Sequence, residues 1–131
     1  MTEYNLETMT AQEVLNAVVE HAIAQPMKSE CSDGTTTTCM YRAPSGLKCF
    51  AGIFIPDAVF HEPMENIAWG DLVSEYPSIP DAHCRLIGRL QTIHDANHVQ
   101  SWPKALLNVA DQLDLEISEK QLERLNRAIC C

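Results

Sequence analysis

The 131-residue sequence carries eighteen acidic side chains against nine basic ones, which gives a formal net charge of −9 at neutral pH. This charge argues against binding to nucleic acid or to an anionic membrane, because both surfaces would repel it. A hydrophobic fraction of 46% excludes an intrinsically disordered chain and is sufficient for a core. We therefore expect a single domain over residues 1–131.

Apolar runs in the sequence are short, and none approaches the roughly 18 residues that a transmembrane helix requires. The N-terminal segment is acidic and lacks the apolar centre of a secretory signal. These features predict a cytoplasmic protein. In that reducing compartment the six cysteines would be free thiols or metal ligands.

Helical spacing of apolar residues recurs along most of the chain. The predicted helices cover residues 11–25, 64–76, 80–96, 101–113 and a last segment that begins near 118. Thr10 with Glu13, and Ser118 with Gln121, form capping-box patterns at the start of two of them. Pro26 ends the first helix.

A β-hairpin is predicted over residues 36–43 and 47–52. Pro44 suits the first position of a type I turn, and Gly46 suits the position that needs a positive φ. Several helices packed against one small antiparallel sheet predict a mostly helical α+β fold.

The register of this hairpin follows from burial. A three-residue turn places Ala43 opposite Leu47 and Tyr41 opposite Cys49, which makes one face almost wholly apolar. That face contains Cys39, Tyr41, Ala43, Leu47, Cys49 and Ala51. The other face would carry Met40, Arg42, Lys48 and Phe50.

The same stretch resembles a family of small bacterial and bacteriophage proteins to which no activity is assigned. The residues that carry the resemblance are Cys39-x-Tyr41-Arg42-x-Pro44-x-Gly46-x-Lys48-Cys49, then Gly52, Ile55-Pro56-Asp57 and Met64-Glu65. Later pieces are similar to the second half of that family, namely Leu90-Gln91, Ile93-His94-Asp95 and Trp102. The resemblance covers residues 39–109 and implies a phage or mobile-element setting, hence a host cytoplasm, but no catalytic roles. Asn66 departs from the glycine that such proteins often place there.

Two cysteines and two histidines have residue types that bind zinc. Cys39 and Cys49 would share one hairpin face, and His94 and His98 are spaced i, i+4 on a helix, so the four could form a Cys2His2 site. This set defines the alternative function, a zinc-binding structural or catalytic protein. Free cysteines on an apolar face are equally typical of an ordinary core, in which no cofactor is needed.

A cysteine nucleophile is the third chemical hypothesis. Cys49, His94 and Asp95 supply the residue types of a thiolate, a base and an orienting acid. Adjacent side chains point apart on a helix, and Cys49 is expected to be buried and inert. We therefore predict no catalytic residues and favour a protein without enzymatic activity, with an enzyme of unidentified reaction as the remaining alternative.

An acidic stretch runs from Phe50 to Cys84, where six acidic residues occur and no Lys or Arg. It predicts either a solvated surface or a face that docks on a basic partner. The predicted partner-binding residues are Asp57, Glu62, Glu65, Trp69, Asp71, Glu75 and Tyr76.

The favoured function is a small non-enzymatic interaction protein. It would be a phage-type accessory or inhibitor protein that binds a host or defence protein through a basic surface of that partner. No nucleic acid, membrane or cofactor is expected to bind, and a homodimer is expected only if an apolar helix face is left exposed.

Overall fold

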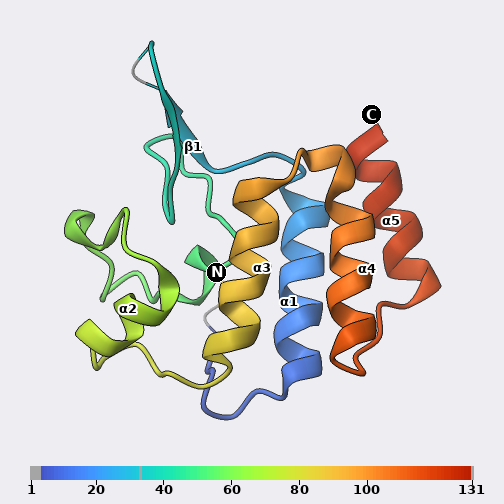
Figure 1. Ribbon diagram of the computed structural model, residues 1–131, viewed down its shortest axis with the longest axis horizontal. Coiled ribbons are helices and arrows are strands. Elements are labelled where there is room, and N and C mark those ends of the chain that lie inside the picture. The colour runs from blue at the N-terminus through green and yellow to red at the C-terminus, as the bar shows by residue number, and fades with distance from the viewer. Residues whose placement is uncertain (1–3, 33, 131) are drawn as a thin grey trace.

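Four helices lie side by side in the computed structural model, which describes residues 4–32 and 34–130 (Figure 1). They are α1 (Ala11–Ala24), α3 (Cys84–Ala96), α4 (Trp102–Gln112) and α5 (Glu119–Cys130). The short helix α2 (Trp69–Glu75) packs against α3, on the side away from α5. No helix in the described residues is both long and apolar enough to cross a membrane.

The two strands β1 (Glu30–Ser32) and β2 (Thr37–Cys39) form an antiparallel ribbon, in which Cys31 pairs with Thr38. The ribbon projects from the helices on the same side of α3 as α2 (Figure 1). The predicted mostly helical α+β fold is confirmed. The predicted strand partner was wrong, because β2 pairs with β1 and not with residues 47–52.

The predicted turn and its register are present, although the ladder beyond them is short. The N–H of Ala43 donates to the carbonyl of Leu47 over 2.9 Å, and the N–H of Cys49 donates to the carbonyl of Tyr41 over 3.3 Å. Gly46 has the positive φ that the turn needs, at 96°. Only one bridge, between Arg42 and Lys48, lies between these two bonds.

The chain leaves this ladder after Cys49, which explains why residues 47–52 do not form a strand. A short 3-10 helix follows at Gly52–Phe54. A side chain at Gly52 would place its Cβ 2.1 Å from the carbonyl oxygen of Tyr41, so only glycine permits this close crossing. Phe50, predicted on the solvent face, is consequently buried at 1% exposure.

Both predicted capping boxes are confirmed. Thr10 Oγ1 accepts the N–H of Glu13 over 3.1 Å, and Glu13 Oε1 accepts the N–H of Thr10 over 2.8 Å. Ser118 Oγ accepts the N–H of Gln121 over 3.1 Å. These bonds satisfy amide groups that would otherwise lack partners in the first turns of α1 and α5.

Two helices begin later than predicted, in each case after a residue with left-handed backbone. Asn66 has φ 67° and precedes α2, which starts at Trp69 and not at Met64. His83 has φ 61° and precedes α3, which starts four residues after Pro80. A left-handed residue cannot continue an α-helix, so the helix starts beyond it.

The core lies where α1, α3 and α4 meet the segment after the turn. Phe50 packs against Trp102 with ring centroids 4.7 Å apart, and both side chains are buried. The largest fully buried side chains are Leu6, Leu15, Phe50, Ile55, Met64, Leu72, Ile79, Ile87, Leu90, Trp102, Leu106 and Leu125.

Candidate functional site

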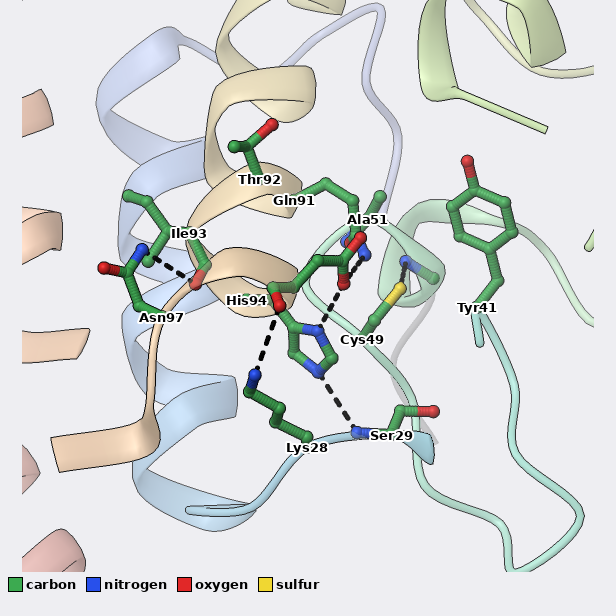
Figure 2. A network of polar contacts seen from close by, with 12 residues as sticks. Lys28, Ser29, Tyr41, Cys49, Ala51, Gln91, Thr92, Ile93, His94 and Asn97 are labelled. Carbon is green, nitrogen blue, oxygen red and sulfur yellow. Dashed lines mark hydrogen bonds and ion pairs between the residues drawn. The ribbon is translucent and has the colours of Figure 1, made fainter. Parts of the chain in front are cut away.

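His94 lies fully buried on the inner face of α3 and packs against the rings of both Phe50 and Trp102, at centroid distances of 5.2 and 5.4 Å. The backbone N–H of Ser29 donates to Nε2 of His94 over 3.1 Å, as Figure 2 shows. Nε2 therefore carries no proton. The ring proton sits on Nδ1, which donates to Oδ1 of Asp95 over 2.8 Å.

The carboxylate of Asp95, which is partly exposed, accepts further hydrogen bonds besides the one from His94. It accepts a bond from Gln91 Nε2 over 2.8 Å and one from the thiol of Cys39. Burial opposes ionisation of Asp95, but the bonds from His94 and Gln91 outweigh it and hold the pKa of the carboxyl below its usual range. The amine of Lys28 bonds the backbone carbonyl of Asp95 over 3.2 Å.

Cys39, Asp95, His94 and Ser29 thus form one chain of hydrogen bonds, which we call the polar chain. It joins the ribbon to α3 through side chains from both elements. The adjacent residues His94 and Asp95 were expected to point apart, and that expectation was wrong because their side chains bond each other directly.

The surroundings of Cys39 and Cys49 do not activate either thiol as a nucleophile. Burial and the negative charge of Asp95 raise the pKa of the Cys39 thiol to about 11. Burial also raises the pKa of the Cys49 thiol, and its sulfur accepts the N–H of Gly52 over 3.2 Å. A catalytic thiol needs a lowered pKa or an adjacent base, and the nitrogens of His94 are both bonded elsewhere.

The predicted zinc ligands come together only in part. The Cys39 sulfur, a His94 ring nitrogen and an Asp95 oxygen lie within 4.8 Å of one another. Cys49 is outside this group and bonded to Gly52, and His98 is exposed before the 3-10 turn Val99–Ser101.

The hydrogen bonds of His94 do not fit metal coordination. Ligation through Nδ1 would move the ring proton to Nε2, where it would meet the N–H of Ser29 as a second donor. Metal-bound histidines normally donate their other N–H to an acceptor. Here the other nitrogen faces a donor, so His94 would have to give up its hydrogen bond with Ser29 to bind an ion.

Two of the five acidic residues that were predicted to bind a partner have polar partners inside the molecule. Glu65 accepts the backbone N–H of Tyr41 over 2.8 Å and that of Arg42 over 3.1 Å. Asp57 pairs with Arg42 over 2.6 Å and with Lys48 over 3.8 Å. The hydrogen bond and charge of Arg42 lower the pKa of Asp57.

The two aromatic residues that were predicted to bind a partner are packed inward. Trp69 is 2% exposed and meets the ring of Tyr41 edge-on, with centroids 6.1 Å apart. Tyr76 is partly buried against His61, at 5.1 Å. They brace α2 and do not present an exposed aromatic anchor.

The remaining acidic side chains are exposed around α2. We call them the acidic lobe, which consists of Glu62, Asp71, Glu75 and the neighbouring Asp81. None of them takes part in an ion pair within residues 4–32 and 34–130.

A groove of about 610 Å³ separates the ribbon from α3 and from the loop before α2. The wall on α3 consists of Gly88, Gln91, Thr92 and Asp95, and the opposite wall includes Thr37 and Cys39 of β2. The sequence analysis missed this groove. The spacing 88, 91, 92, 95 places these four residues on one helical face, opposite the apolar face, and is the signal that could have found the α3 wall.

In comparisons with known proteins, no family model, no curated protein and no solved structure matches this chain. The described residues define a small α+β protein in which the thiols of Cys39 and Cys49 and the buried imidazole of His94 are bonded to other parts of the fold. Carboxylates and an open groove remain at its surface, and these are the features from which a function can be inferred.

Proposed function

We propose that this chain is a protein-binding protein that works without catalysis, and that it docks on a basic partner through the acidic lobe. The carrying observation is that the acidic lobe takes part in no ion pair within residues 4–32 and 34–130, while the two bases of the turn segment are engaged elsewhere. Arg42 and Lys48 both turn to Asp57, and Arg42 also donates to the carbonyl of Ile55 over 2.6 Å. The segment that carries the acidic lobe, from Phe50 to Cys84, itself supplies no Lys or Arg.

A surface of one sign raises the rate at which an oppositely charged partner associates, and it disfavours partners of the same sign. Exposed ion pairs contribute only about 0–1 kcal/mol each, so the lobe would steer and orient the complex. Most of the affinity would come from less exposed contacts beside it. In the setting that the resemblance of residues 39–109 implies, the partner would be a host or defence protein, and the chain its inhibitor or accessory.

Capture from a host lysate tests this proposal at two salt concentrations. The immobilised protein should retain a partner in low salt and release most of it at moderate salt, because screening shortens the reach of the lobe. The retained protein should carry a basic surface. Absence of any salt-sensitive partner under both conditions would contradict the proposal.

A further inference from the structure

One edge of β2 is unpaired. The N–H of Met40 donates to the carbonyl of Ser29 over 2.9 Å, and Thr38 pairs with Cys31 on β1. Because backbone groups alternate in direction along an antiparallel strand, those of Thr37 and Cys39 point to the opposite side. Within residues 4–32 and 34–130 the sheet has two strands only, so no third strand covers this edge.

This edge opens into the groove. The backbone N–H of Tyr41 points to the same side as those of Thr37 and Cys39, because these residues are two apart along the strand. It donates to the carboxylate of Glu65, which lines the groove. Glu65 therefore occupies, beside Tyr41, the position that a neighbouring strand would occupy beside Thr37 and Cys39. At Tyr41 the edge is closed by Glu65 and by Cys49, whose N–H donates to the Tyr41 carbonyl over 3.3 Å, and beyond Tyr41 it is open.

The groove has room for the side chains of an added strand. A methyl group at Gly88 on α3, or at Gly70 in α2, would meet no atom within 4 Å. These two glycines stand on different walls and both border the groove. The space in front of them is therefore not filled by the protein itself.

The charge of the groove selects the chemistry of its occupant. Glu65 and Asp95 line it, and none of the described residues that line it is Lys or Arg. The Asp95 side chain is 43% exposed, so its charge is accessible from the groove. An acidic polar groove beside an open strand edge fits an extended peptide that carries a basic residue.

We propose that an extended segment of the partner adds a strand to the free edge of β2, with a Lys or Arg side chain between Glu65 and Asp95. Backbone hydrogen bonds to Thr37 and Cys39 hold the segment, and the carboxylates select the basic residue. This inference rests on the proposed function and names the part of the partner that enters the protein.

A display library of random linear nonapeptides tests this inference with the full chain. Peptides selected on the wild-type protein should share a Lys or Arg at one position and should bind Gly88→Leu at least tenfold more weakly. Leucine at this site projects into open space and favours the helix, so Gly88→Leu should melt no lower than the wild type. Gly70→Leu blocks the other wall and should give the same loss of binding.

Amide hydrogen exchange locates the bound peptide. The amides of Thr37 and Cys39 should exchange at least tenfold more slowly in the complex. Two versions of each peptide, N-methylated at its odd or at its even positions, should differ in binding, because only one of the two sets of peptide N–H groups faces β2. Selected peptides without a basic residue, equal affinity for Gly88→Leu, or unchanged exchange at Thr37 and Cys39 would each overturn the inference. Protection of these amides in a self-associated dimer without peptide would also overturn it, because the occupant would then be a second copy.

Docking through the acidic lobe and peptide binding in the groove can be tested independently. Glu62, Asp71 and Glu75 do not line the groove, so reversing them to Lys should leave the affinity for the selected peptides within about threefold after salt screening. A captured partner that depends on these acids and binds Gly88→Leu as well as the wild type would leave the proposed function standing and reject the groove as the docking site.

Discussion

Ser29 donates its backbone N–H to Nε2 of His94 at a place where both residues have 0% exposure. This bond anchors the base of the ribbon to α3, since the carbonyl of Ser29 also accepts the N–H of Met40. The buried histidine is therefore a structural acceptor whose protonation pattern is fixed by its neighbours. His98, four residues further along the chain, is exposed and lies after the end of α3.

Replacing His94 by alanine should lower the free energy of unfolding by about 3 kcal/mol. The substitution leaves the Ser29 amide buried without an acceptor and opens a cavity beside Phe50 and Trp102. Chemical unfolding measures the loss. His98→Ala is the matched control and should change stability by less than about 0.5 kcal/mol; equal effects of the two substitutions would refute a structural role for His94.

Glu65 is expected to stabilise the fold through its two hydrogen bonds to the backbone. Glu65→Gln replaces one carboxylate oxygen with an amide donor that faces a backbone N–H of Tyr41 or Arg42, and should cost about 1–2 kcal/mol of unfolding free energy. Amide exchange at Tyr41 and Arg42 should accelerate. Glu62→Gln, on the exposed lobe, should leave both the stability and the amide exchange unchanged. A similar loss of stability in Glu62→Gln would show that the hydrogen bonds of the Glu65 carboxylate do not stabilise the fold.

Asp95 should make stability depend on acid pH. Its pKa is lowered in the folded protein, so the unfolded chain binds a proton first as the pH falls. The stabilisation from its ionised form is present above the ordinary aspartate value of about 4 and is lost as the pH falls through the lower, folded pKa. Asp95→Asn should flatten the stability curve at acid pH, below the ordinary aspartate pKa of about 4, relative to the wild type. Asp57, whose pKa is also lowered, is present in both proteins and contributes equally to both curves. Stability curves of the wild type and Asp95→Asn that run parallel would therefore contradict the role of Asp95.

Zinc should be dispensable. The donor that Ser29 presents to His94 disfavours metal at Nδ1, so dialysis against a chelator should leave the melting temperature unchanged. Elemental analysis should find well below one zinc per chain. Stoichiometric zinc that is lost together with stability in Cys39→Ser would contradict this prediction and favour the metal alternative.

The helices were predictable because their signals are local. Apolar spacing and capping residues lie within each segment, and Thr10 with Glu13 fixes the start of α1 from four consecutive residues. Strand β1 gave no such signal, since Glu30, Cys31 and Ser32 are all exposed and no apolar alternation marks them. The turn at Gly46 was found from its residues, but the partner of β2 depends on where the chain goes after Cys49.

The site was less predictable because it depends on contacts between distant residues. A run of acids looks the same in sequence whether each carboxylate is solvated or bonded. Glu65 reaches back 24 residues to the amide of Tyr41, and Asp57 reaches 15 to Arg42. Cys39 and Asp95 were each noted in the sequence, yet their bond appears only when the ribbon is placed against α3.

Charge reversal with a matched control tests the central claim most directly. Glu62, Asp71 and Glu75 are changed to Lys in one protein, and the exposed Asp111, Glu116 and Glu119 are changed to Lys in another, so both variants gain the same positive charge. Asp71 and Glu119 each lie in the first turn of a helix, which balances the cost to folding. The account predicts that the lobe variant binds the captured partner at least tenfold more weakly at low salt, while the control variant stays within threefold of the wild type. Equal losses in the two variants would contradict docking through the acidic lobe.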